Sequence, residues 1–383
     1  MAASTIKSRD YLTLHVGGKV KLAYVRRNQE ILLVSSPGSR WPSSLLRNRR
    51  ARISLDGMEI NGTPFLITDE SEKKSILDLF SAKYDHESVE KWFGRSSRFI
   101  VIRTDVSSPV YDYEENYNLW ITEEFNSIAE HYDDHIFGNF INSYLRSRSI
   151  ETMMKIFPAS SDLLEIGCGS GTETLTLLKS GFRVTAIDIS EKMIRIVNQK
   201  AEREGVKGNL KSYRLSFSEV DKVPDASGIA SFDGIYSTYG AFNCDPHIDR
   251  LPGKLHRLLK PGGILFLGVY NKLCASEILL HAFGMKIGRI FERFRNPVPE
   301  GNSRFCVDVF SYSPMYVKRL FSQYFNVVSI EAVPLIIPPS NYVHFMEKLP
   351  GNSVLESLDR RLSKLPFLNV LGDHFLIVLK RKG

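Results

Sequence analysis

One stretch of the chain, residues 162–188, constrains the fold more than any other. An apolar run at 162–166 leads into Gly167, Gly169 and Gly171, and a second apolar run ends on Asp188. The leucines between the two runs follow helical spacing, so the order predicts a strand, a tight loop, a helix and a second strand. Three loop positions lack a Cβ, so the backbone can approach a ligand closely, and the first N–H groups of the helix point to the same place. We expect a nucleoside-bearing ligand, with Asp188 accepting hydrogen bonds from its ribose.

The residues around the glycines indicate which nucleoside-containing ligands the loop can bind. The dinucleotide fingerprint needs Gly or Ala where this chain has Thr172, and a phosphate-binding P-loop needs Lys where Thr172 follows Gly171. Glu165 precedes the first glycine by two residues. A carboxylate there is a poor neighbour for a pyrophosphate and a suitable one for a ligand that carries ammonium and sulfonium groups. NAD, FAD and nucleoside triphosphates are therefore disfavoured.

The series Glu165-x-Gly167-x-Gly169-x-Gly171 with Asp188 resembles the first two motifs of class I S-adenosylmethionine (SAM) dependent methyltransferases. Lys260-Pro261-Gly262-Gly263, just before an apolar strand, resembles a later motif of the same family. The resemblance implies an α/β, Rossmann-like, seven-stranded sheet for residues 161–383, with SAM as the cofactor. It implies cofactor-binding roles for Glu165, Gly167, Cys168, Gly169, Gly171, Asp188, Ile189, Met193, Ser216, Phe217 and Ser237. The family often has an acidic residue at the position of Ser216 to Ser218, which this chain lacks.

The rest of residues 161–383 continues the alternation of strands and helices. Ser190 is expected to cap a helix, and further strands are predicted at 210–215, 232–237, 264–269, 325–337 and 375–380, the last of them antiparallel. Ligands bind at the carboxyl ends of such strands. Two insertions, 271–313 and 338–373, are expected to form a cap over the pocket. Their apolar residues indicate a small, hydrophobic acceptor.

Residues 111–160 are expected to form a linker and a lid helix. The acidic, tyrosine-rich segment 111–118 has no periodicity, and a helix is predicted over 121–145. The order Phe125-Asn126-x-x-Ala129-x-x-Tyr132-Asp133 resembles the helix that folds over the cofactor in small-molecule methyltransferases. Tyr132 would then reach the ligand, although an amphipathic packing helix explains the same residues.

The catalytic side chains are less clearly indicated than the cofactor site. Methyl transfer from a sulfonium needs chiefly an aligned acceptor and the exclusion of water. Tyr239 and Asn243 follow the fourth strand and are candidates for orienting a substrate. His247, His281, His344 and His374 are candidates for a general base by region only, of which His247 lies nearest to that strand. The acceptor and its reacting atom stay open.

Residues 1–110 are predicted to form a small, mainly β domain. Alternating segments at 21–25, 30–35, 52–56, 63–68 and 98–103 are separated by turn residues, and Asp69 is expected to cap one helix. The segments Ile31–Ser36, Arg40-Trp41-Pro42-x-x-Leu45-Leu46 and Arg98-x-Ile100-x-Ile102 resemble the split β-barrel of flavin- and deazaflavin-dependent nitroreductase-like proteins. That resemblance implies FMN or a deazaflavin near Arg40 and Trp41, and hence a bifunctional chain. A docking or homodimerisation module without a cofactor is the alternative.

Composition limits the remaining classes. Residues 1–110 hold 18 Lys and Arg against 12 Asp and Glu, most of the surplus behind the net charge of +7. No aromatic interleaving, zinc spacing or RNA-binding signature accompanies this charge, so nucleic acid is not an expected partner. The four cysteines have no metal-ligand spacing, so no metal is expected. No apolar run suits a membrane span or a signal peptide, so a cytoplasmic enzyme is expected. A SAM-binding regulator without catalysis is the non-enzymatic alternative.

Overall fold

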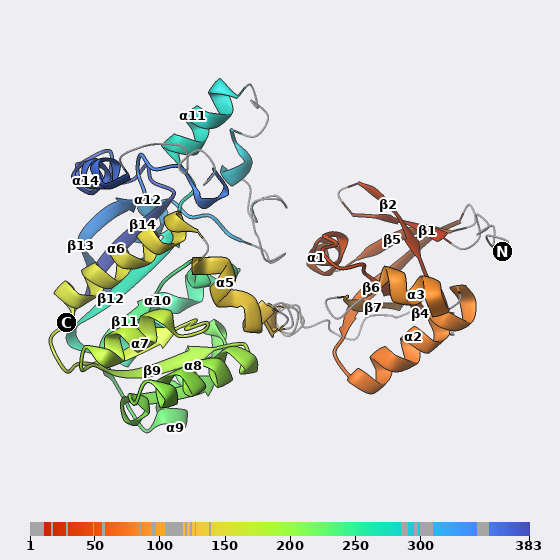
Figure 1. Ribbon diagram of the computed structural model, residues 1–383, viewed down its shortest axis with the longest axis horizontal. Helices are drawn as coiled ribbons and strands as arrows, with labels where there is room; N and C mark the ends of the chain where they lie inside the picture. The colour runs from red at the N-terminus through yellow and green to blue at the C-terminus, as the bar shows by residue number, and fades with distance from the viewer. Residues whose placement is uncertain are drawn as a thin grey trace. The chain divides into compact units, whose positions relative to one another are not determined.

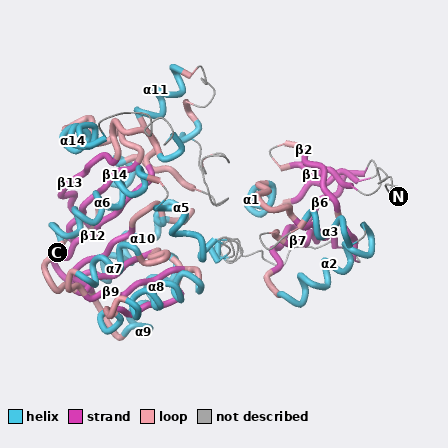
Figure 2. Tube along the Cα trace, in the orientation of Figure 1, coloured by secondary structure: helices cyan, strands magenta, loops and turns pink. Residues whose placement is uncertain are grey.

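The computed structural model describes residues 11–16, 18–27, 30–48, 50–55, 58–84, 86–93, 97–103, 118, 121–122, 125–126, 128–137, 139–284, 290–294, 298, 309–342 and 352–383. The chain forms two compact units, one ending at Ser127 and the other starting at Ile128. Figure 1 labels the elements of each unit, and Figure 2 shows strands in both. None of the described helices is long and apolar enough to cross a membrane.

In the described part of the N-terminal unit, a seven-stranded antiparallel sheet is accompanied by helices. Its strand order is β2-β1-β5-β6-β7-β4-β3. The strands are β1 (Tyr11–His15), β2 (Lys19–Ala23), β3 (Val25–Arg27), β4 (Glu30–Val34), β5 (Ala51–Leu55), β6 (Met58–Ile67) and β7 (Phe99–Arg103). The helices are α1 (Trp41–Asn48), α2 (Glu70–Tyr84) and α3 (His86–Trp92).

Two corners curl this sheet. The first half of β6 pairs with β5 and its second half with β7, and the change occurs at Gly62. A Cβ on Gly62 would lie 2.5 Å from Ile102 Cγ2 of β7, so a larger residue would push the strands apart. At the other corner only Tyr24 separates β2 from β3, which are the two ends of the strand order. Tyr84 pins this corner, because its hydroxyl accepts from the Tyr24 N–H and donates to the Tyr24 carbonyl. The outermost strands of the sheet are thus consecutive in the chain.

The strand predictions for this unit are confirmed in outline. The segment predicted as one strand over 21–25 is instead divided at Tyr24 between β2 and β3. Asp69 caps α2 as expected, its carboxylate accepting from the Glu72 N–H at 2.8 Å. β1 is not among the predicted strands, although its buried Leu12 and Leu14 alternate with less buried residues as a strand requires.

The C-terminal unit contains the predicted α/β fold with a seven-stranded sheet. Its order is β10-β9-β8-β11-β12-β14-β13, in which the first five strands are parallel and the last two join antiparallel. The strands are β8 (Asp162–Ile166), β9 (Arg183–Asp188), β10 (Leu210–Arg214), β11 (Phe232–Ser237), β12 (Leu259–Tyr270), β13 (Phe325–Val333) and β14 (His374–Arg381).

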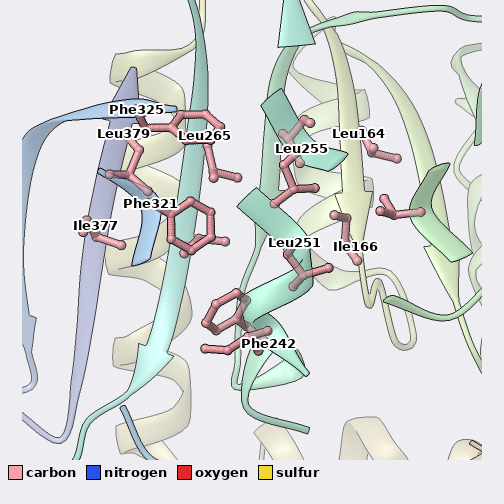
Figure 3. Close-up of a cluster of buried hydrophobic side chains, with 14 of the residues drawn as sticks. Leu164, Ile166, Phe242, Leu251, Leu255, Leu265, Phe321, Phe325, Ile377 and Leu379 are labelled. Carbon is pink, nitrogen blue, oxygen red and sulfur yellow. The ribbon is translucent and has the colours of Figure 1, made fainter. Parts of the chain in front are cut away.

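Helices cover both faces of this sheet. The helices are α5 (Tyr132–Phe137), α6 (Phe140–Ile156), α7 (Thr172–Lys179), α8 (Glu191–Arg203), α9 (Val223–Ser227), α10 (Leu251–Leu258), α11 (Ala275–Phe283), α12 (Pro314–Phe321) and α14 (Asn352–Leu362). Apolar side chains of α10 and α12 pack on one face with Leu164, Leu265 and Ile377 (Figure 3). Residues of α6, α7 and α8 pack on the other face with Leu163, Phe266 and Val378. Burial on both sides explains why the strands are continuously apolar.

The single lid helix predicted over 121–145 is wrong. A 3₁₀ turn η2 (Ala129–His131) leads into the short α5, and α6 starts afresh at Phe140. Asn139 causes the break, because its side chain accepts from the Ile141 N–H at 2.9 Å and so caps α6. α6 then continues beyond the predicted end, to Ile156. The two regions predicted as insertions contain α11 and α14.

Candidate functional site

The glycine loop between β8 and α7 is bound to the neighbouring strand. Gly167, Gly169 and Gly171 all have positive φ angles, between 53° and 84°, which side chains other than glycine rarely adopt. The N–H groups of Gly167 and Cys168 both donate to the Ile187 carbonyl of β9, at 2.8 and 3.0 Å. The loop therefore lies directly over the end of β9.

Asp188 joins this loop to the next helix. Its carboxylate accepts from the Gly169 N–H at 2.8 Å through one oxygen and from the Ser190 N–H at 2.9 Å through the other. Asp188 is only 8% exposed, and this burial raises the pKa of its carboxyl group to about 6. The glycine loop and the acidic strand end, singled out separately in the sequence, are thus in direct contact.

Three side chains approach the loop from other elements. A Cβ on Gly169 would lie 3.6 Å from the ring of Tyr132 in α5, and one on Gly167 would lie 3.6 Å from the ring of Phe217. Ala241, in the 3₁₀ turn η5 (Ala241–Cys244), leaves no room for such a Cβ, since its own Cβ would be 2.5 Å away. Tyr132 and Phe217, two predicted site residues, therefore lie at the glycine loop.

The lid segment is tied to the loop by charge. The Ser170 hydroxyl donates to the carboxylate of Asp133, which follows Tyr132 in α5. Lys200 of α8 donates to the same carboxylate and also to the Ser170 carbonyl, at 3.0 Å. These bonds hold Tyr132 over Gly169.

Beside the loop lies a buried ion pair that the sequence analysis missed. Arg146 of α6 donates to the Glu173 carboxylate of α7 at 2.6 Å, and its guanidinium lies 4.0 Å from the ring centre of Tyr239. Both partners are almost fully buried. The signal was present in the sequence as two charged residues in otherwise buried helix positions, but nothing local pairs residues 27 positions apart.

Several polar atoms in this region have no partner among the described residues. They are Arg146 Nε, Glu173 Oε1 and Ser237 Oγ, all inaccessible to solvent. Leaving one such atom unsatisfied costs about 1–3 kcal/mol, so proteins retain them chiefly where a ligand or water pairs with them. Their presence on α6, α7 and the end of β11 favours a polar ligand at this edge of the sheet.

Glu165 adds a further buried acid below the loop. Its carboxylate accepts from the Tyr236 hydroxyl at 2.9 Å and from the Thr174 hydroxyl. Burial, and then the charge of nearby Glu173, raise the pKa of Glu165 to about 8. A cationic ligand bound there would favour the ionised form of Glu165.

The other predicted cofactor residues occupy supporting positions. Met193 is buried in α8, whose N-terminus Ser190 caps as predicted, by accepting from the Met193 N–H at 3.1 Å. Ile189, which lies between Asp188 and Ser190 in the chain, is half-buried. Ser216 starts the 3₁₀ helix η4 (Phe217–Lys222), where the Glu219 carboxylate accepts from its N–H at 3.1 Å. An acidic residue, Glu219, therefore directly follows the segment 216–218. Cys168 is buried, which raises the pKa of its thiol.

The three predicted catalytic residues bond to different parts of the fold. The Tyr239 hydroxyl donates to the Asn142 carbonyl of α6 at 2.9 Å. The Asn243 side chain is fully buried, donates to the carbonyls of Tyr270 and Phe310, and accepts from the Tyr270 N–H. These bonds connect η5 to β12. They give no support to a substrate-orienting role for Asn243. His247 is half-buried, and its role stays a prediction.

Of the other histidines, His344 lies outside the described residues. His281 is buried in α11 and lies 3.2 Å from the Tyr342 hydroxyl. His374 opens β14 beside Asp373.

Comparison with known proteins identifies the central part of this unit. Residues 163–263 match the model of a family described as a methyltransferase domain. A demethylmenaquinone methyltransferase of Leptospira interrogans is 28% identical over 152 residues, which cover 38% of this chain and 58% of that protein. An erythromycin 3''-O-methyltransferase of Saccharopolyspora erythraea is 30% identical over 109 residues, or 28% of this chain and 34% of that protein. The chain thus spans 58% of the length of the first of these curated relatives and 34% of the second.

Among solved structures, a Burkholderia thailandensis 1,6-didemethyltoxoflavin-N1-methyltransferase with bound S-adenosylhomocysteine aligns with a TM-score of 0.43 at 18% identity, over 73% of this chain and 94% of its own. The matched residues contain the glycine loop, Asp188 and the strand end at Ser237. Residues 163–263 are therefore similar to a methyltransferase domain.

Proposed function

We propose that the chain transfers a methyl group from SAM to a small organic acceptor. The observation that carries this proposal is the contact between the glycine loop and Asp188, next to buried polar atoms that have no partner among the described residues. Such a site suits a ligand with a sugar at one end and a zwitterionic tail at the other.

The proposed cofactor arrangement follows from the charges. Asp188 would hold the ribose, since each carboxylate oxygen can accept a second hydrogen bond. Arg146 would pair with the aminoacyl carboxylate through its unpartnered Nε, while Glu173 and Glu165 would attract the ammonium and the sulfonium. Phe217 would contact the adenine. SAM supplies a methyl group on a positively charged sulfur, and the chain's own residues orient it and exclude water.

The acceptor is proposed to be a small, hydrophobic molecule. The curated relatives support this by name, since one is a demethylmenaquinone methyltransferase and the other an erythromycin 3''-O-methyltransferase. The described parts of 271–313 and 338–373, with Tyr132 of α5, are proposed to enclose it.

Titration calorimetry with SAM tests the cofactor site. Asp188→Ala should weaken SAM binding at least about tenfold, because a buried hydrogen-bonding carboxylate is lost. Asp162→Ala is the matched control: Asp162 begins β8 at the opposite edge of the sheet, paired with Arg183, and its removal should leave SAM affinity unchanged. Equal affinities for wild type and Asp188→Ala would refute the site.

A second variant tests the ion pair. Arg146→Met keeps the length and apolar stem of the side chain but removes the proposed carboxylate partner. It should weaken SAM more than adenosine, which lacks the aminoacyl tail. An equal effect on both ligands would contradict the proposed orientation.

Catalysis and mere binding are also separable. If the chain were a SAM-binding regulator, calorimetry would detect SAM, but no labelled methyl group would move to any small molecule in a cell extract. Transfer of label from methyl-labelled SAM to an organic-soluble product supports the enzyme.

For the N-terminal unit we propose a split β-barrel, supported by the two corners at Gly62 and Tyr24. Trp41 is buried at the start of α1, whereas Arg40 is exposed and available to a flavin phosphate. Visible absorbance of the purified chain after incubation with FMN or a deazaflavin would support the cofactor alternative. A colourless dimer in sizing and light-scattering measurements would support the dimerisation module.

A further inference from the structure

A histidine and an aspartate form a dyad where β14 begins. His374 Nδ1 lies 3.0 Å from the Asp373 Oδ2 atom. Asp373 is buried, whereas the His374 side chain keeps 18% of its surface exposed. Nothing in the proposed cofactor site uses either residue.

Asp373 is fixed as a carboxylate by Arg293. The guanidinium donates to its other oxygen at 2.6 Å and to its backbone carbonyl at 3.0 Å. This pairing lowers the pKa of Asp373 well below its ordinary value. Arg293 also binds Glu277, and Cys274 lies close enough for these side chains to resemble a metal site. The guanidinium already supplies the positive charge between the two carboxylates, so the cluster positions Asp373 rather than a metal ion.

The dyad sets the tautomer of His374. An ionised carboxylate at Nδ1 accepts only from a protonated nitrogen, so the proton of the neutral ring lies on Nδ1. The Nε2 atom then carries a free lone pair, and it has no hydrogen-bond partner in the described part of the chain. The ring is held edge-on against Tyr270, with centroids 5.3 Å apart. This is the arrangement in which a carboxylate orients a histidine as a base.

Strand register places His374 beyond the strand ends that carry the proposed cofactor site. Ser237, at the end of β11, is level with Leu267 of β12, whereas His374 pairs with Tyr270, three residues further along. β12 and β14 thus extend about 10 Å beyond the ends of β8 and β11. β14 also lies two strands from β11, a lateral distance of about 10 Å. A ligand resting on the ends of β9, β8 and β11 would therefore have this extension as a wall on its acceptor side.

We propose that His374 is the general base of the transfer and that the acceptor is a hydroxyl compound, a phenol or an alcohol. This inference rests on the proposed SAM-dependent activity. The acceptor oxygen attacks the methyl carbon, the new O–C bond forms as the C–S bond breaks, and the sulfur keeps the bonding electron pair. The hydroxyl proton passes to Nε2 of His374, and the resulting imidazolium is paired with Asp373.

The chemistry of acceptors explains the choice of class. A neutral amine already offers a lone pair, and a thiol ionises close to neutral pH, with an ordinary pKa of about 8.5. A phenol resembles tyrosine, whose ordinary pKa is about 10, and an alcohol holds its proton more strongly. A hydroxyl acceptor must lose its proton as the new bond forms, so it gains a large factor from a positioned base, typically about 100-fold or more.

The test compares two phenols that differ in acidity. Wild type, His374→Asn and His256→Asn are assayed near neutral pH with methyl-labelled SAM and 2-naphthol, 4-nitrophenol, benzylamine or thiophenol. His256 is the matched control, a half-buried histidine beside Lys382 at the opposite edge of the sheet. His374→Asn should lose at least about 100-fold on 2-naphthol and less than about tenfold on 4-nitrophenol, about half of which is already ionised near neutral pH and needs no base. His256→Asn should resemble wild type.

Equal losses on the two phenols would make His374 structural and overturn the proposal. Wild-type product from benzylamine or thiophenol alone, or from no probe, would overturn the hydroxyl class. Calorimetry separates these outcomes from failure of the proposed function, which would appear as no SAM binding by wild type. If His374→Asn fails to fold, ¹⁵N NMR of the wild-type ring decides: a proton on Nδ1 is expected, and one on Nε2 would overturn the proposal.

Discussion

In wild type the free energy of unfolding should fall as the pH rises, and Glu165→Gln should abolish the part of this fall that Glu165 causes. The pKa of Glu165 is raised from 4.5 to about 8 in the folded protein. Between these values the folded state binds more protons than the unfolded state, so the free energy of unfolding falls with rising pH. The difference between the two pKa values corresponds to about 5 kcal/mol. Glutamine cannot ionise, and its side-chain oxygen can still accept from Tyr236 and Thr174. The variant should therefore gain up to this amount on wild type at alkaline pH.

Native-state hydrogen exchange of the β8 and β11 amides, measured from about pH 5 to about pH 9, follows the opening of this sheet. Asp188, whose pKa is also raised, contributes the same slope to wild type and variant, so the difference between them isolates Glu165. Glu204→Gln is the control, because Glu204 is exposed and Lys179 lowers its pKa. That variant should keep the alkaline loss of stability. Parallel pH curves for wild type and Glu165→Gln would refute the reasoning.

Further substitutions probe the loop, the cap and the N-terminal unit. Gly171→Ala places a Cβ 2.2 Å from Val197 Cγ2 at a φ of 84°, so thermal denaturation should show a loss of about 2–4 kcal/mol, whereas Gly208→Ala, with open space around it, should change little. Asp359→Ala removes the carboxylate that accepts from three consecutive backbone N–H groups, at 335–337. It should cost about 3 kcal/mol or more and expose α14 to protease, and a loss under about 1 kcal/mol would contradict this account. Gly62→Ala should lower the free energy of unfolding of the N-terminal unit by about 1–3 kcal/mol, which thermal denaturation would detect. The SAM affinity measured by calorimetry should not change.

Much of the fold could be predicted because its signals are local. A strand reveals itself by the burial pattern of five or six neighbouring residues, and a cap such as Ser190 bonds within its own first turn. The lid was mispredicted for a similar reason: Asn139 acts locally, but its cap was not distinguished from a polar residue inside a helix.

The sequence by itself determined the seven-stranded α/β sheet, the glycine loop and the acidic strand end, because periodicity and the need for positive φ are properties of short segments. Only the tertiary structure decided which charges meet. Arg146 of α6 pairs with Glu173 of α7, and Arg293 pairs with Asp373, which is 80 positions away in the chain. Such pairs form because a charge removed from water must find a partner wherever packing brings one, and packing is set by the whole fold.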